Sequence, residues 1–216
     1  MIYTYTSSAD TLRIDLKDIV TYLGYYGVKC DCTTESMLNE CLGKFIESVT
    51  FKACYALLPV KIGEKVSVGN MEFRGESLKK NLAGCEKAYV FAATAGSESQ
   101  RLIAKNSIIS PLKGIITDCI GSAAIEAFCD EFNKKLEENE FLRPRFSPGY
   151  GDLPLECQKE ILTFLDAKNK IGLSLNDSLM MSPSKSVTAI IGIGKEKNKC
   201  KGPGCMICSG ENCPYR

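Results

Sequence analysis

Four cysteines near the C-terminal end have the residue type and spacing of a metal site. Cys200, Cys205, Cys208 and Cys213 are separated by four, two and four residues, with glycine and proline between them. Thiolates bind zinc and iron–sulfur centres, and glycine permits the tight turns that direct several sulfur atoms toward one centre. The sequence therefore predicts a cysteine-rich metal-binding tail. The alternative is a tail of four exposed reduced thiols, which would be prone to oxidation.

The spacing of this quartet bears on the metal. Four-cysteine zinc sites usually form two knuckles with a longer spacer between them, whereas a compact run ending in Cys-Pro is more typical of iron–sulfur proteins. We favour a [4Fe–4S] cluster, with zinc as the second choice. The unit Cys30-Asp-Cys32 is a weaker pattern, to which we assign a surface role. Apolar surroundings predict core positions for Cys41, Cys54, Cys119, Cys129 and Cys157.

The composition excludes several other classes of chemistry. The chain has 216 residues, 12 cysteines and no histidine, so Ser-His and Cys-His couples and histidine metal ligands are absent. A net charge of +1 gives no field that would gather nucleic acid or anionic membrane. The N-terminal residues lack a signal-peptide pattern, and no apolar stretch approaches the ~18 residues of a spanning helix. We expect a cytoplasmic protein, where cysteines do not form a disulfide framework.

A second candidate site is the loop over residues 141–156, FLRPRFSPGYGDLPLE. Arg145 could bind a carboxylate with two hydrogen bonds, Gly149 could let a ligand approach the backbone, and Tyr150 could supply a flat wall. This combination suits a small zwitterionic or nucleoside-like ligand. The alternative is that the arginine and the tyrosine only brace the loop.

The apolar pattern predicts the elements that position these residues. Helices are expected at the end of residues 10–29, over residues 37–58, after residue 97, over residues 111–138 and up to about residue 167. Strands are expected at the start of residues 10–29, in a hairpin around Gly69-Asn70, over residues 87–96 and over residues 187–193. Helices and strands do not alternate regularly, and the hairpin indicates antiparallel pairing. We therefore predict an α+β fold, a single compact domain over residues 1–194 with a twisted antiparallel sheet flanked by helices, followed by the cysteine-rich appendage over residues 195–216.

Several segments resemble the activation domain of cobalamin-dependent methionine synthase. The Arg-x-x-x-Gly-Tyr motif at 145–150, in its Ser-Pro-Gly-Tyr context, is similar to the S-adenosylmethionine-binding motif of that family. Residues 87–96, 125–128 and 173–188 resemble other segments of the same domain, in the same order. Residues 20–26, VTYLGYY, followed by Gly27, resemble stand-alone versions of it. The likeness covers about residues 87–193.

The resemblance implies a set of site residues. Contacts with S-adenosylmethionine are implied for the motif residues Arg145, Ser147, Pro148, Gly149 and Tyr150, and Glu126 would face the same pocket. The chain departs from the family at Ala123, where the family has an arginine, and the family's N-terminal aspartate could correspond to Asp15 or Asp18. The Cys-Pro-acid-His sequence that follows the tyrosine in the family is missing, and its late tyrosine has no counterpart here.

The resemblance also implies a function. A stand-alone activation domain would remethylate, from S-adenosylmethionine, the cobalamin of a methionine synthase that lacks its own activation domain, or of another corrinoid protein. Catalysis would then be a positioning task without a histidine base. The quartet could relay an electron from a donor. The alternatives are a non-catalytic docking or chaperone module for a corrinoid protein, an iron–sulfur electron-transfer partner, and a zinc module for nucleic acid, which the near-zero net charge argues against.

Overall fold

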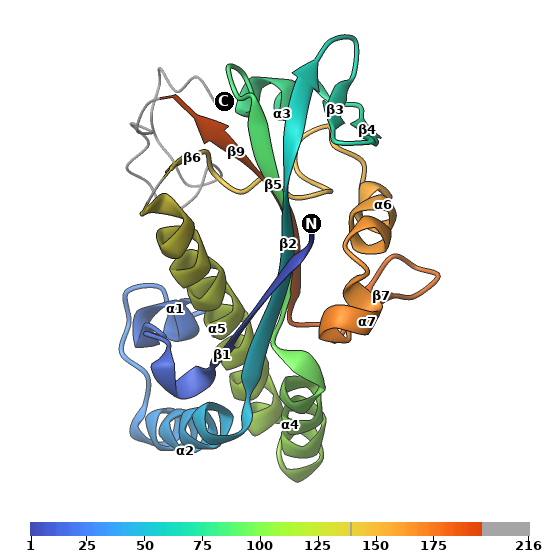
Figure 1. The fold of residues 1–216 in the computed structure, drawn as a ribbon. Coiled ribbons are helices and arrows are strands. Elements are labelled where there is room, and N and C mark those ends of the chain that lie inside the picture. Colours follow the sequence, from blue (N-terminus) through green and yellow to red (C-terminus); the bar gives the residue numbers. More distant parts are fainter. Residues whose placement is uncertain (139, 196–216) are drawn as a thin grey trace.

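A seven-stranded antiparallel sheet forms the centre of the molecule in the computed structural model, which describes residues 1–138 and 140–195 (Figure 1). The strands pair in the order β4-β3-β2-β5-β9-β6, and β1 pairs with β2 beside this path. Their bounds are β1 Tyr3–Ser8, β2 Thr50–Ile62, β3 Val66–Val68, β4 Met71–Phe73, β5 Lys87–Thr94, β6 Phe141–Leu142 and β9 Ser186–Gly194. A separate small hairpin pairs β7 (Ser174–Leu175) with β8 (Met181–Ser182).

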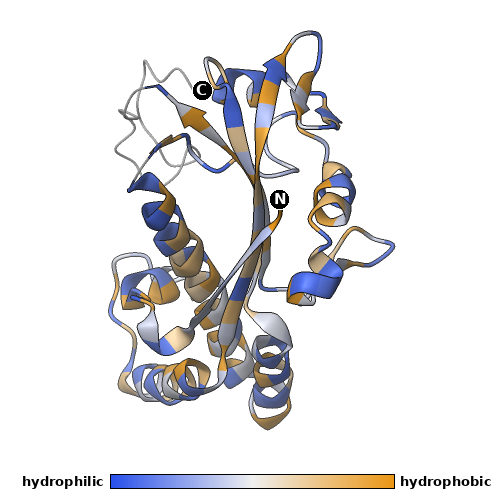
Figure 2. Cartoon of the chain, in the orientation of Figure 1, coloured by the Kyte–Doolittle hydropathy of each residue, from blue (hydrophilic) through white to orange (hydrophobic). Residues whose placement is uncertain are grey.

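Helices cover both faces of the sheet. Figure 1 shows α1, α2 and α5 on one side of the sheet and α6 and α7 on the other. The helix bounds are α1 Leu16–Tyr22, α2 Cys32–Ser48, α3 Glu76–Asn81, α4 Gly96–Ile109, α5 Pro111–Glu137, α6 Cys157–Phe164 and α7 Ala167–Ile171, with a short 3-10 turn at Ala9–Thr11. The helices carry both hydrophilic and hydrophobic residues (Figure 2), as expected for elements with one face on a core.

The central strands are buried on both faces because successive side chains point to opposite sides. In β5, Phe91 and Ala93 join the core beneath α5, whereas Val90 and Ala92 join the core beneath α6 and α7. Aromatic rings fill the first core: the ring centroids of Phe51 and Phe128 lie 5.1 Å apart and those of Phe91 and Phe132 4.9 Å apart. Helix α5 is thereby fixed along the middle of the sheet.

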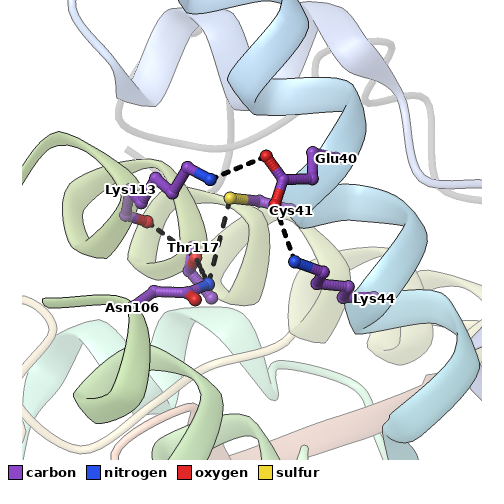
Figure 3. A network of polar contacts seen from close by, with 6 residues as sticks. All are labelled: Glu40, Cys41, Lys44, Asn106, Lys113 and Thr117. Atoms are coloured by element: carbon purple, nitrogen blue, oxygen red, sulfur yellow. Dashed lines mark hydrogen bonds and ion pairs between the residues drawn. The ribbon is translucent and has the colours of Figure 1, made fainter. Parts of the chain in front are cut away.

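A polar network secures the beginning of α5 (Figure 3). Glu40 on α2 accepts from Lys44 at 2.6 Å and from Lys113 on α5 at 2.7 Å. Buried Asn106 on α4 donates to the Thr117 hydroxyl at 2.7 Å, and that hydroxyl donates to the Lys113 carbonyl at 2.7 Å. The network joins three helices and satisfies polar groups that would be costly to bury alone.

The α+β fold with an antiparallel sheet is confirmed, as are the hairpin at Gly69-Asn70, the strand from residue 87 and the helix from Pro111. The helix predicted over residues 37–58 is wrong in its second part, because α2 ends at Ser48 and residues 50–62 form β2. The apolar residues there also suit a strand buried on both faces. The helix expected up to about residue 167 ends at Phe164, and a separate helix, α7, follows Asp166, which has a left-handed backbone. The strand expected at the start of residues 10–29 is wrong, because β1 lies earlier and Leu12 and Ile14 reach the core from irregular backbone.

The cysteines within the described residues behave largely as expected. Cys41, Cys54, Cys119 and Cys129 are buried, whereas Cys157 is half-buried. Cys30 is half-buried and Cys32 is exposed. No helix in the described part of the chain is long and apolar enough to cross a membrane.

Candidate functional site

One face of α5 carries a row of polar side chains. Asp118, Ser122, Glu126 and Asp130 follow one another at intervals of four residues, which places them on successive turns of the same helix face. The opposite face of the helix packs its apolar residues, including Phe128, against the sheet. The row therefore faces away from the sheet, where residues from other elements can reach it.

Arg145 lies against the second half of this row. Its Nη2 atom donates to Glu126 Oε2 at 2.7 Å, and its Nη1 atom donates to Asp130 Oδ1 at 2.8 Å. The Arg145 side chain is 17% exposed, compared with 48% for Glu126 and 64% for Asp130. Two carboxylates therefore share one guanidinium, and the cluster keeps one surplus negative charge at neutral pH.

The loop that carries Arg145 is anchored at both ends. On one side, the Arg143 N–H donates to the Gly192 carbonyl, and Phe146 exchanges two backbone hydrogen bonds with Ile190 of β9 at 2.8 and 2.9 Å. On the other, Asp152 accepts from the backbone N–H groups of Glu76 and Ser77 at the start of α3. These N–H donors hold the pKa of Asp152 below its usual range. Backbone hydrogen bonds to β9 thus fix the residues on both sides of Arg145, and the Arg145 side chain extends from there to α5.

The turn that follows depends on glycine. Gly149 and Gly151 have φ angles of +89° and +54°, a region that favours glycine. A Cβ on Gly151 would also lie 2.6 Å from the Ser77 hydroxyl. The Tyr150 N–H donates to the Ser147 carbonyl at 3.1 Å, and the Tyr150 ring meets the Phe146 ring edge-on at 6.3 Å. Tyr150 itself is 52% exposed, so its ring forms an accessible wall beside the turn.

Tyr22, at the end of α1, belongs to the same region. Partial burial raises its pKa, and the negative charges of Glu126 and Asp18 and the nearby Tyr150 raise it further. Glu126, Asp18 and Tyr150 therefore each lie within electrostatic reach of Tyr22. Tyr22 was not predicted as a site residue; the only signal for it was its position within residues 20–26. Two aspartates could correspond to the family's N-terminal aspartate. Asp15 caps α1 by accepting from the Lys17 N–H at 2.9 Å, whereas the charge of Asp18 contributes to the raised pKa of Tyr22.

Lys185 occupies the first half of the row and was also missed. Its Nζ atom lies 2.8 Å from Asp118 Oδ1 and 2.9 Å from Ser122 Oγ, and the side chain is 13% exposed. The aliphatic stem passes over Gly121, where a Cβ would lie 3.0 Å from Lys185 Cγ. Its carbonyl accepts from the Ala95 N–H at 2.9 Å. Lys185 therefore ties the segment before β9 to α5 and to the turn after β5.

The structure thus pairs Glu126 with Arg145, while Ser147 and Pro148 form the turn between Arg145 and Gly149 and the exposed Tyr150 follows that turn. Ala123, at the position where the resemblance implied an arginine, is buried at 3% exposure. The four cysteines of the predicted metal site, Cys200, Cys205, Cys208 and Cys213, lie outside the described residues. Within residues 1–138 and 140–195, no group of three or more metal-binding side chains could hold a metal ion.

The fold is that of a reactivation domain. The solved structure of the MetH reactivation domain bound to AdoHcy superimposes with a TM-score of 0.70 and 16% sequence identity, covering 93% of this chain and 80% of that chain. Residues 126–199 match the family model described as the vitamin B12 dependent methionine synthase, activation domain. No curated protein matches the chain. The chain therefore resembles the activation domain of cobalamin-dependent methionine synthase in fold and, over residues 126–199, in sequence.

Proposed function

We propose that the chain takes part in the reactivation of protein-bound cobalamin with S-adenosylmethionine, acting on a separate methionine synthase or another corrinoid protein. The proposal is supported by the family match over residues 126–199, which includes Glu126 and the Arg145–Tyr150 motif. The observation that carries it is the ion pair between Arg145 and Glu126, 2.7 Å apart, on a loop whose next turn carries Tyr150.

The charges of this cluster suit the proposed ligand. S-adenosylmethionine carries a sulfonium, an ammonium and a carboxylate. Arg145 offers donors for the carboxylate, and the surplus negative charge of Glu126 and Asp130 favours the cations. The exposed ring of Tyr150 adds a surface on which a sulfonium or an adenine could pack. The donor set and the aromatic walls therefore fit the ligand.

The methyl group of a sulfonium is already activated, so the task of the chain would be to bind and orient it and to exclude water. In the proposed reaction an external donor supplies one electron, the methyl group passes from sulfur to cobalt, and S-adenosylhomocysteine and methylcobalamin are the products. The partner protein would supply the cobalamin. The loop around Lys185, which is held on α5, is a candidate for contact with it.

Binding and turnover together test this proposal. The full chain is titrated with S-adenosylmethionine by calorimetry and is then mixed anaerobically with a cob(II)alamin protein, reductant and S-adenosylmethionine. We expect binding and formation of methylcobalamin by the wild type, and at least a hundredfold weaker binding by Arg145→Ala. Arg101→Ala is the matched control, because Arg101 is also ion-paired, to Glu98 at 3.2 Å, but lies on α4. Equal binding by the wild type and Arg145→Ala would contradict the proposal.

A second candidate function is a docking or chaperone module for a corrinoid protein. It is favoured by Ala123 in place of the arginine and by the engagement of both terminal nitrogens of Arg145 within the chain. This candidate predicts that neither the wild type nor Arg145→Ala binds S-adenosylmethionine, while the chain still binds the corrinoid protein.

The proposed [4Fe–4S] cluster of Cys200, Cys205, Cys208 and Cys213 is tested separately. An anaerobic visible spectrum with metal analysis should show iron and sulfide in the full chain, and the Cys205→Ser variant should lose them. Bound zinc without iron absorbance would favour the second choice.

A further inference from the structure

We propose that Asp130 is a positioning residue for Arg145, and that a zwitterionic ligand enters by exchanging the internal Glu126–Arg145 ion pair for two ion pairs of its own. This inference rests on the proposed function and adds to it the way in which the site changes between its free and its bound form.

The geometry of the guanidinium gives the first argument. An arginine can bind one carboxylate through two parallel hydrogen bonds, but here the two terminal nitrogens are divided between two carboxylates one helical turn apart. Within the described residues, neither carboxylate pairs with another cation. One contact can therefore open while the other keeps the guanidinium in place.

The charge balance gives the second argument. The cluster has two carboxylates and one guanidinium. Glu126 can therefore bind a cation while Asp130 still neutralises the charge of Arg145. A ligand ammonium would bind Glu126, and the ligand carboxylate would take the place of Glu126 at Nη2. One ion pair is then exchanged for two, and no charge in this partly buried site is left alone.

The surroundings assign different roles to the two carboxylates. Glu126 lies next along the row to Ser122, which Lys185 contacts, and its charge contributes, after burial itself, to the raised pKa of Tyr22 at the end of α1. Asp130 is also the more exposed of the two. We therefore assign the exchange to Glu126, the less exposed carboxylate, and the holding of Nη1 throughout binding to Asp130, the more exposed one.

Calorimetric titration of the full chain with three adenosyl thioethers tests the exchange. S-adenosylhomocysteine carries both charges, an analogue without the amino group carries only the carboxylate, and 5′-methylthioadenosine carries neither. We expect Asp130→Asn to bind S-adenosylhomocysteine at least tenfold more weakly and methylthioadenosine within twofold of the wild type, and we expect Asp130→Glu to restore most of the affinity.

The Glu126→Gln variant distinguishes the ion-pair exchange from a purely structural role of Glu126, through its affinity for the carboxylate-only analogue. The carboxylate-only analogue must displace Glu126 and leave it unpaired in the wild type, so we expect it to bind several-fold more tightly to Glu126→Gln. Weaker binding of the carboxylate-only analogue to Glu126→Gln, or unchanged affinity of Asp130→Asn for S-adenosylhomocysteine, would overturn the proposed exchange of ion pairs but not the proposed function. Failure of the wild type to bind S-adenosylhomocysteine would overturn the proposed function as well.

Discussion

The two halves of α5 are joined to the rest of the molecule in different ways. In the first half, Glu40 is shared by Lys113 and Lys44, Asp118 pairs with Lys185, and Asn106 donates to the Thr117 hydroxyl, so that no carboxylate is in excess. In the second half, Glu126 and Asp130 share Arg145 and leave one negative charge in excess. In the first half every carboxylate has a cation from another residue and joins neighbouring elements, whereas the carboxylate in excess in the second half would favour a cationic group in the proposed ligand.

The second half of α5 has a different source of stability. Phe128 and Phe132 stack on rings of the sheet, and the Phe132 and Tyr55 ring centroids lie 4.8 Å apart. These contacts fix the helix without help from Glu126 or Asp130, which lie on its other face. In the proposed site, Glu126 would therefore serve the ligand and Asp130 would hold Arg145, while the carboxylates of the first half are committed to the fold. Three further predictions test this contrast through the first half.

The largest effect is expected at the crossing of α4 and α5. A Cβ on Gly114 would lie 2.8 Å from the Ser107 Cα atom, so the backbones would have to separate. Overpacking of this kind costs about 1–3 kcal/mol, and the better helix propensity of alanine offsets up to ~1 kcal/mol of it. We expect Gly114→Ala to lower the free energy of unfolding by about 1–2 kcal/mol, measured by urea denaturation. Gly43→Ala on α2, where a Cβ would meet nothing within 4 Å, should instead stabilise the protein.

A smaller loss is expected at Lys185. Lys185→Met keeps much of the apolar stem over Gly121 but removes the contacts with Asp118 and Ser122. Because Asp118 is half exposed, its charge can be solvated, and we expect a loss of about 1 kcal/mol in the free energy of unfolding. Lys159→Met on α6 is the control, since Lys159 is exposed and has no ion pair among the described residues. Equal stability of the two variants would show that the Lys185 contacts do not hold the fold.

The smallest effect is a pH dependence at Glu40. Hydrogen bonds from Lys113 and Lys44 lower the pKa of Glu40 from 4.5 to about 2. A lowered pKa in the folded state stabilises the protein above about pH 4.5, and this contribution is lost as the pH falls toward 2. We expect Glu40→Gln to melt at a slightly lower temperature than the wild type at pH 7, with the difference vanishing near pH 2. Glu47→Gln controls for the change in net charge, and a difference independent of pH would contradict the prediction.

Much of the fold could be predicted from local patterns. The Gly69-Asn70 hairpin, the strand from residue 87 and the helix beginning at Pro111 each depend on residues that are neighbours in the chain. The boundary between α2 and β2 could not, because apolar residues near residue 50 suit both a helix face and a strand buried on both sides. Only the pairing of β2 with β1 and β5 distinguishes the two.

The sequence by itself determined the types of group in the site. The types and spacing of Arg145, Gly149 and Tyr150 indicated a small zwitterionic or nucleoside-like ligand, whereas Glu126 and the positioning chemistry were implied by the resemblance to the activation domain. The tertiary structure decided which charges meet. Arg145 and Asp130 lie 15 residues apart, and Lys185 and Ser122 lie 63 apart, so no periodicity links them. Their contacts exist because β9 holds both the Arg145 loop and the Lys185 segment against one face of α5.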